Sequence, residues 1–219
     1  MQLYGYWRSS ASYRVRIALA LKGIAYDYVP VHLLKNGGEQ KGIEYAQLNP
    51  AQLVPTLELT DSESGATVRL NQSLAIIEYL DACFPEHPLL PANPLKAAQV
   101  RTLALDMAAD LQPITNLRIL QYLTGTQGQP DSAKQAWIEH WIAAAFAAFE
   151  QRLATTAGKY CVGDSITLAD ICLVPQVYNA KRFGVDLTAY PRLKEIAERL
   201  AEHPAFIAAA PEQQPDANM

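Results

Sequence analysis

The feature that most constrains the fold is the segment PEHPLLPANP, residues 85–94, in which four of ten residues are proline. Proline fixes φ and removes a backbone donor, so this stretch cannot lie inside a helix and is typical of a semi-rigid linker. Short β-rich and helical patterns alternate before it, and only helical patterns follow it. The sequence therefore predicts two domains, at residues 1–84 and 95–219, joined by a linker at 85–94.

The first domain is predicted to be α/β, a small mixed sheet with helices. Gly23 is placed to close the first helix in a left-handed conformation, and TDSESGA between two strand-like runs indicates a hairpin turn. The expected order is β-α-β-α-β-β-α. The segments lie at 3–7, 10–22, 25–31, 42–48, 56–59, 67–70 and 72–84.

The second domain is predicted to be all-helical. Residues 95–122 are expected to form one long helix, and 132–154 a second with a broad apolar face. A third helix is expected at 167–184, where Thr167 and Asp170 are spaced as a capping box, and one or two short helices at 191–209. The tail at 211–219 is expected to be loosely held.

Composition and charge exclude several functions. A net charge of −4, from 18 basic and 22 acidic residues, gives no basic surface for nucleic acid. The longest apolar stretch, WIAAAFAAF, is shorter than the roughly 20 residues of a membrane span, and the N-terminus lacks a signal core. The three cysteines and four histidines are too scattered for a disulfide framework or a metal site. We expect a cytoplasmic protein without metal, nucleic-acid or membrane partners.

The segment RSSASYRVRIAL, residues 8–19, places several hydroxyls where a strand hands over to a helix. One serine suffices as an N-cap, yet Ser9, Ser10 and Ser12 are all present. A helix N-terminus also favours an anion, and a thiolate held there would form more easily from its thiol. Because no cysteine lies at this junction, the thiol would come from a ligand. Capping and anion binding both remain open.

Two further segments have the same double interpretation. Pro55 in QLVPTLEL is either an ordinary edge-strand proline or part of a cis turn that leaves the Val54 backbone free to pair with an extended peptide ligand. Gln72 and Ser73 open a helix directly after a strand, as a cap or as a second anion site. Two hydroxyl-rich junctions in one small domain suggest one ligand with two anionic ends.

Four segments resemble the zeta class of glutathione transferases over nearly the whole chain: SSASYRVRIALALKG, LNPAQLVPTL, NQSLAIIEYLD and YCVGDSITLADICLVPQVYNAKRFGVDL. The resemblance implies a thioredoxin-like N-terminal domain, an all-helical C-terminal domain, a homodimer and glutathione as cofactor. It also implies cis–trans isomerisation of a small dicarboxylate substrate, maleylacetoacetate to fumarylacetoacetate, in tyrosine and phenylalanine catabolism.

The resemblance assigns roles residue by residue. Ser9 and Ser10 would be catalytic, with the Ser9 hydroxyl holding the glutathione sulfur as thiolate. Arg8 and Arg182 would bind substrate carboxylates, although a basic residue near a helix C-terminus is also favourable for the helix dipole. The implied glutathione-binding residues are Ser9, Ser10, Gln40, Val54, Pro55, Gln72, Ser73, Gln112, Asn116 and Arg118.

One position departs from the family, and several alternatives remain. Zeta enzymes usually carry Ser-Ser-Cys at this turn, whereas the third residue here is Ala11. A mechanism in which glutathione supplies the sulfur is unaffected. The alternatives are maleylpyruvate isomerisation, conjugation of glutathione to α-haloacids, and a non-catalytic binding protein. Tyr6 is a second choice for activating glutathione, and a disulfide oxidoreductase is disfavoured because the 9–12 turn lacks cysteine.

Overall fold

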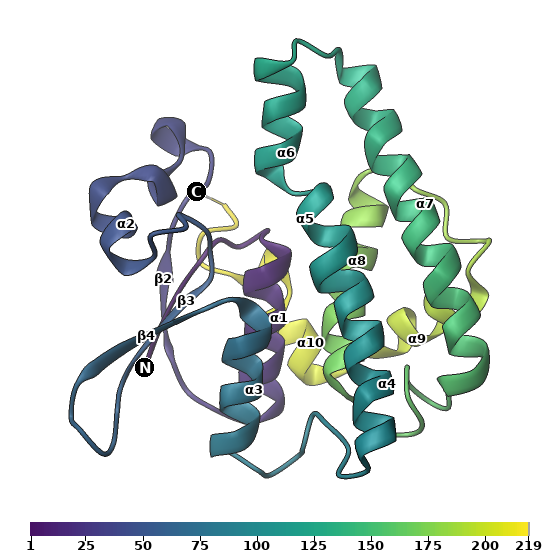
Figure 1. The fold of residues 1–219 in the computed structure, drawn as a ribbon, viewed down its shortest axis with the longest axis horizontal. Coiled ribbons are helices and arrows are strands. Elements are labelled where there is room, and N and C mark those ends of the chain that lie inside the picture. The colour runs from purple at the N-terminus through teal and green to yellow at the C-terminus, as the bar shows by residue number, and fades with distance from the viewer. Residues whose placement is uncertain (219) are drawn as a thin grey trace. The chain divides into compact units, whose positions relative to one another are not determined.

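The structure is a computed structural model that describes residues 1–218, and the chain divides into two compact units. The first unit combines Met1–His87 with the chain from His203 onward, and the second spans Pro88–Glu202 (Figure 1). The expected division at 84–95 lies close to this one. The end of the chain differs, since residues from 203 onward were expected in the helical domain and belong to the first unit instead.

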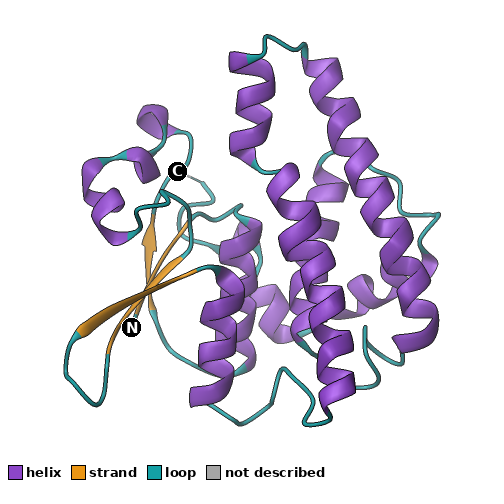
Figure 2. Cartoon of the chain, viewed as in Figure 1, coloured by secondary structure: helices purple, strands orange, loops and turns teal. Residues whose placement is uncertain are grey.

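The first unit contains a four-stranded mixed sheet in the order β2-β1-β3-β4. Strand β1 (Gln2–Gly5) runs parallel to β2 (Asp27–Pro30) and antiparallel to β3 (Thr56–Thr60), which forms the hairpin with β4 (Thr67–Asn71). All four strands belong to this unit (Figure 2). The predicted α/β domain with its hairpin is confirmed, and the arrangement is thioredoxin-like.

Helix α1 (Ser10–Leu21) is the centre of the first unit, packed against both α3 (Ser73–Cys83) and α10 (Pro204–Ala209). Figure 1 shows α1 and α3 on one side of the sheet and α2 (Ile43–Leu48) on the other. Most of α1 is buried, because its run of Val, Ile, Ala and Leu lies between these neighbours. Gly23, at φ +64°, follows the helix in the left-handed conformation that the sequence predicts.

The chain after α10 is held against the first unit, contrary to the expectation of a loose tail. A short 3-10 helix covers Pro211–Gln213, and Gln214 and Asp216 are buried. The Gln214 side-chain amide donates to the carbonyl oxygens of Ala210 at 2.9 Å and Ala208 at 3.2 Å. The polar composition of this segment suggested exposure, but its side chains find buried partners.

The second unit is built from helices, as predicted, with its long first helix interrupted. The expected single helix at 95–122 is wrong: helical turns of π type follow α4, and an extended residue, Asn116 at ψ 150°, separates α5 from α6. Proline at 113 removes a donor, and the Asn116 side chain accepts from the Arg118 N–H and restarts the helix. The segments are α4 (Pro94–Leu105), a π segment (Asp106–Leu111), α5 (Gln112–Ile114), α6 (Leu117–Gln121), a second π segment (Tyr122–Thr126), α7 (Asp131–Thr156), α8 (Leu168–Arg182) and α9 (Pro191–Ala201).

Helix α8 begins with the expected capping box and packs on α4. The Asp170 carboxylate accepts from the Thr167 N–H at 2.8 Å and from the Cys161 N–H at 2.9 Å. Burial raises the pKa of Asp170, although these donors oppose the rise. Among residues 1–218, no helix is long and apolar enough to cross a membrane.

Candidate functional site

Ser9 is the N-cap of α1, and its backbone is extended at φ −70° and ψ 121°. Its Oγ accepts the Ser12 N–H at 3.2 Å, while the Ser9 N–H donates to the Tyr6 carbonyl at 2.9 Å. A hydroxyl that accepts in this way still has its own proton to donate. Capping and anion binding are therefore compatible at one residue, because the cap uses a lone pair and the anion would use the proton.

A buried arginine links the two hydroxyl-rich junctions. Arg14, which is 2% exposed, donates through Nη1 to Ser73 Oγ at 2.8 Å and through Nε to the Ser10 carbonyl at 3.4 Å. Ser10 and Ser73 are the first residues of α1 and α3. The structure therefore brings both helix N-termini to one buried cation, which adds positive charge to the partial charges of the helix ends. Sequence reasoning missed Arg14, whose signal was a pair of arginines inside an apolar run.

Gln72 precedes α3 in an uncommon backbone conformation. Its φ is +68° and its ψ is 114°, a region that residues other than glycine rarely occupy. The side chain is exposed and makes no cap hydrogen bond to α3. Backbone strain of this kind costs about 1–3 kcal/mol and tends to be kept at functional sites. This conformation is consistent with the ligand-binding role that the sequence predicts for Gln72.

The peptide bond between Val54 and Pro55 is cis, the alternative that the sequence left open. The Leu53 carbonyl before it is held by the Tyr45 hydroxyl at 2.8 Å and the Asn49 side-chain amide at 2.7 Å. Within the described chain, the hydrogen bonds of this turn leave the Val54 backbone N–H and C=O unused. An extended peptide could pair with these two groups as an added strand does.

Gln40 lies in a 3-10 turn, Glu39–Lys41, and is 8% exposed. Its Oε1 is buried and has no hydrogen-bond partner within the described residues. Gly38, at φ +105°, lies so close that a Cβ there would sit 2.7 Å from Gln40 Nε2. A buried acceptor without a partner lowers the stability of the fold, and a ligand that donates a hydrogen bond to it would remove that cost.

Four further predicted residues belong to the second unit. Gln112 begins α5, Asn116 caps α6, and Arg118 is exposed on α6. Arg182 ends α8, with its guanidinium 4.3 Å from the centre of the Phe183 ring. In the first unit, the Arg8 guanidinium lies 4.9 Å from the Trp7 ring in the same manner. Each arginine thus has an aromatic support that orients the planar group.

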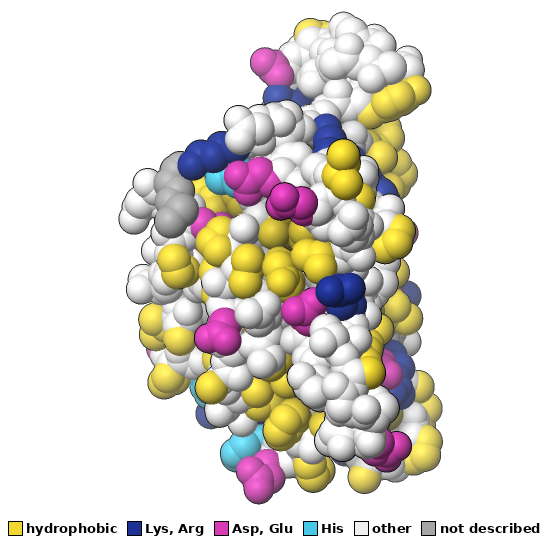
Figure 3. Space-filling view, turned by 90° about the vertical axis from the view of Figure 1, so that its left-hand side faces the viewer, with side chains coloured by type: hydrophobic (Ala, Val, Ile, Leu, Met, Phe, Trp, Pro, Cys, Tyr) yellow, Lys and Arg dark blue, Asp and Glu magenta, His cyan; other side chains and the backbone are white. Residues whose placement is uncertain are grey.

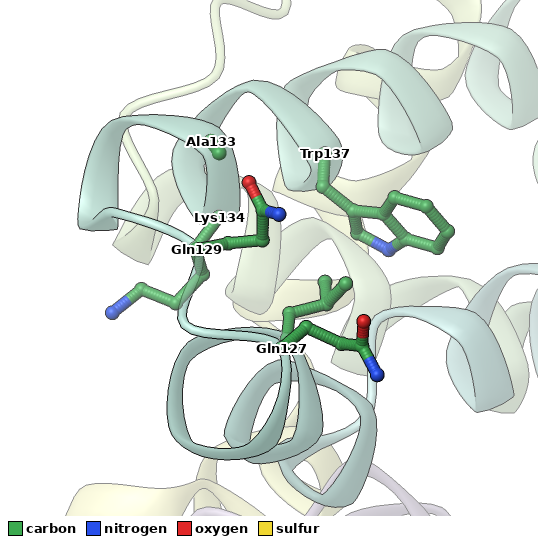
Figure 4. A pocket seen from close by; sticks show the side chains of 6 residues that line it. Gln127, Gln129, Ala133, Lys134 and Trp137 are labelled. Atoms are coloured by element: carbon green, nitrogen blue, oxygen red, sulfur yellow. The ribbon is translucent and has the colours of Figure 1, made fainter.

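A small pocket of about 250 Å³ in the second unit is lined by the second π segment, the turn after it and the start of α7 (Figure 4). Its walls combine the Trp137 indole, the Gln127 and Gln129 amides and the Lys134 stem. The Trp137 N–H is used inside the unit, donating to the Ile114 carbonyl at 2.8 Å. None of the sequence-predicted site residues lines this pocket.

A wider pocket of about 600 Å³ lies on the first unit, between α2 and the strands β1 and β2. Tyr4, Val31 and Tyr45 are among the residues that line it, together with the acidic residues Glu39 and Glu44. Figure 3 shows the apolar side chains that gather on this side of the molecule, with acidic groups among them. The predicted thiolate-binding serines do not line it.

The chain matches two models of one protein family. Residues 8–83 match "Glutathione S-transferase, N-terminal domain", and residues 115–209 match "Glutathione S-transferase, C-terminal domain". The chain belongs to the glutathione S-transferase family. The family resemblance that the sequence indicated is thus confirmed.

Relatives and solved structures match this chain over nearly its whole length. A probable maleylacetoacetate isomerase of Vibrio cholerae is 55% identical over 98% of this chain and 97% of its own. A holo structure of a maleyl pyruvate isomerase, a bacterial zeta-class transferase, has a TM-score of 0.91 at 46% identity, covering 99% of both chains. A maleylacetoacetate isomerase of Anaeromyxobacter dehalogenans, with dicarboxyethyl glutathione and citrate in its active site, has a TM-score of 0.87 at 41% identity, covering 100% of this chain and 97% of that one.

Proposed function

We propose that this chain is a glutathione-dependent cis–trans isomerase that converts maleylacetoacetate to fumarylacetoacetate. Full-length relatives named for this reaction support the proposal, as does a relative crystallised with dicarboxyethyl glutathione. The observation that carries it in this chain is Ser9, a helix N-cap whose hydroxyl proton is left to donate. Tyrosine and phenylalanine catabolism, a cytoplasmic location and a homodimeric state are parts of the same proposal.

The residues of the first unit fit the groups of a glutathione molecule. The backbone of Val54 suits the cysteinyl part. Gln40 Oε1, which has no hydrogen-bond partner among the described residues, suits a donor group of glutathione. Gln72 and Ser73, at the start of α3, suit the γ-glutamyl carboxylate, because a helix N-terminus stabilises an anion. Ser10 and Pro55 are also proposed to bind glutathione. From the second unit, Gln112, Asn116 and Arg118 are assigned to the cofactor by family resemblance.

Glutathione, when bound, supplies a thiolate whose reversible addition to the activated double bond permits rotation about that bond. The Ser9 hydroxyl donates a hydrogen bond to the sulfur, and the N-terminus of α1 adds partial positive charge. Both favour the thiolate over the thiol. Arg14 places a further cation behind the same turn. Arg8 and Arg182 bind the substrate carboxylates and stabilise the negative charge that develops on the carbonyl oxygen.

The test is isomerisation of maleylacetoacetate and maleylpyruvate, followed by ultraviolet absorbance with and without glutathione. Turnover is expected to require glutathione and to fall about 100-fold in Ser9→Ala, the scale of losing one positioned donor. Ser132→Ala, an exposed serine on α7, is the matched control. If neither acid turns over while glutathione binds, the isomerase proposal is wrong and conjugation to α-haloacids or a binding role remains.

Maleylpyruvate is the second candidate substrate, because a structural neighbour with a TM-score of 0.91 bears that name. Both acids are small dianions with a cis double bond next to a carbonyl, so the same thiolate and arginines serve either one. The ratio of kcat/KM for the two acids decides between them.

A further inference from the structure

A buried carboxylate from the end of the chain contacts the turn that carries Ser9. Asp216 is 2% exposed, and its Oδ2 accepts the Trp7 N–H at 3.0 Å and the Tyr28 hydroxyl at 3.3 Å. Trp7 lies two residues before Ser9, beyond the end of β1. Trp7 and Asp216 are 209 residues apart in sequence, so the C-terminal segment contacts the turn that follows β1.

A buried arginine holds the same turn from its carbonyl side. Arg16 is fully buried, and its Nη2 donates to the Trp7 carbonyl at 2.8 Å, its Nη1 to the Tyr6 carbonyl at 3.4 Å. Its Nε donates to the Ala209 carbonyl at 3.0 Å, at the end of α10. Both polar backbone groups of Trp7 are therefore fixed by ionisable side chains, and each of these is tied to the C-terminal segment.

The charges around this turn support one another. Burial lowers the pKa of Arg16, and the nearby tyrosines and the Asp216 carboxylate act in the opposite direction. Burial and the Asp216 charge raise the pKa of Tyr28 far above its ordinary value, so the phenol keeps its proton and donates it. Asp216 Oδ1 is buried without a hydrogen-bond partner in the described residues. A site kept only for stability would gain little from such an oxygen, because an unpaired buried acceptor is costly.

Burial and hydrogen bonds within the tail fix the position of the Asp216 carboxylate. Pro211 is buried, and the Gln214 amide closes the tail onto the end of α10. The Ala217 N–H donates to the Gln214 carbonyl at 3.0 Å, which forms a turn around Asp216. The position of Asp216 is thus defined on both sides by hydrogen bonds.

We propose that Asp216 is a positioning residue for catalysis: by holding the Trp7 N–H from the C-terminal segment, it sets where Ser9 presents its hydroxyl to the glutathione sulfur. The inference rests on the proposed function, since it concerns the same thiolate site. Displacement of a catalytic group by about 1 Å can cost on the order of 100-fold in rate, so an anchor two residues away is sufficient to matter.

The experiment compares Asp216→Ala with Asp216→Asn in the full-length chain. Asparagine keeps an oxygen that can accept the Trp7 N–H, and alanine does not. Asn218→Ala, an exposed residue of the same tail, is the matched control. Each variant is measured for kcat and KM, for the pKa of bound glutathione from the ultraviolet absorbance of its thiolate, and for thermal stability.

In Asp216→Ala we expect the pKa of the bound thiol to rise by about one unit, so that kcat measured at a pH below that pKa falls about tenfold with the thiolate fraction. KM for the acid substrate should rise as well, because Arg8 follows Trp7 directly and its guanidinium lies 4.9 Å from the centre of the Trp7 ring. Asp216→Asn should recover most of the loss, and Asn218→Ala should behave as wild type. If Asp216→Ala does not fold, Asp216→Glu replaces it, with the same loss expected because its carboxylate is one methylene further out.

Two results would overturn the inference. The first is a folded Asp216→Ala or Asp216→Glu protein with wild-type kcat and thiol pKa, even if its melting temperature is lower. The second is an Asp216→Asn protein as impaired as Asp216→Ala, which would remove the Trp7 hydrogen bond as the cause. Failure of the proposed function looks different, because the wild-type chain would then show no glutathione-dependent isomerisation.

Discussion

Tyr45 is the residue whose ionisation the structure constrains most simply. It is 5% exposed, its hydroxyl donates to the Leu53 carbonyl before the cis bond, and burial raises its pKa to about 12. The unfolded chain ionises this phenol near pH 10 and the folded chain only near pH 12, so the folded state binds more protons between them. The stabilisation is fully present below pH 10 and is lost as the pH rises through about 12.

Tyr45→Phe should remove this alkaline dependence. We expect the free energy of unfolding of the wild-type chain to fall between pH 10 and 12 by up to about 3 kcal/mol more than that of the variant. Urea titrations at closely spaced pH values measure both slopes. Equal slopes for the two proteins would show that Tyr45 ionises alike in both states.

Ser73 has a structural task that its proposed ligand role does not reveal. Its Oγ accepts from Arg14 Nη1, and both side chains are buried. Ser73→Ala removes the acceptor from a buried cation, which should lower the free energy of unfolding by about 1–3 kcal/mol in the absence of glutathione. Denaturant unfolding measures this, with exposed Ser132→Ala as the control. A loss seen only when glutathione is present would assign Ser73 to ligand binding alone.

The interruption of the first long helix of the second unit is the clearest property at the scale of an element. Asn116 precedes α6 in an extended conformation, and its Oδ1 accepts the Arg118 N–H at 3.1 Å. This side chain is also one of the predicted glutathione contacts, so its two roles need separating. Aspartate keeps the capping oxygen and loses the amide, whereas alanine loses both.

Asn116→Ala should therefore increase hydrogen exchange within α6 and lower stability by about 1 kcal/mol, while Asn116→Asp leaves both near wild type. Mass-spectrometric hydrogen exchange over residues 115–127 tests the capping role. The affinity of Asn116→Asp for glutathione tests the other, since weak binding by a well-capped variant would mean that the amide contacts the cofactor. Fast exchange in Asn116→Asp would contradict the capping assignment.

The elements that sequence patterns predict well are those whose hydrogen bonds are local. The hairpin, the end of α1 at Gly23 and the capping box of α8 follow from neighbouring residues, and the structure confirms all three. The break at Thr115–Asn116 was missed because apolar spacing alone does not show where the turns of a helix change their hydrogen bonding.

The candidate site divides in the same way. Ser9 and Gln72 are predicted as site residues because they lie at strand-to-helix junctions, where helix N–H groups are unpaired. Arg14 and Asp216 were missed because their partners lie 59 and 209 residues away along the chain. Contacts of that separation depend on the fold. The pair of arginines inside an apolar run indicates that Arg14 is unusual, but it does not show which residues Arg14 contacts.

At the scale of the whole chain, the main property is that the first unit is formed by two segments far apart in sequence. Its helix α1 is covered by α10, which comes from beyond the helical unit in sequence. Phe206 on α10 is 1% exposed, and the Tyr13 hydroxyl donates to the Phe206 carbonyl at 3.4 Å. Burying a phenylalanine contributes about 1.5–3 kcal/mol, a large part of what a domain of this size can have. The N-terminal segment alone therefore lacks part of its core.

We expect a protein of residues 1–87 to show no cooperative thermal transition by circular dichroism. The same segment joined through a long flexible Gly/Ser linker to residues 203–219 should unfold cooperatively, because the second segment returns Phe206 to α1 and the Ala209 carbonyl to Arg16. A linked protein carrying Phe206→Ala is the control and should melt at a lower temperature or not cooperatively. Cooperative melting of residues 1–87 alone, at the temperature of the linked protein, would show that the C-terminal segment is an addition to a complete core rather than part of it.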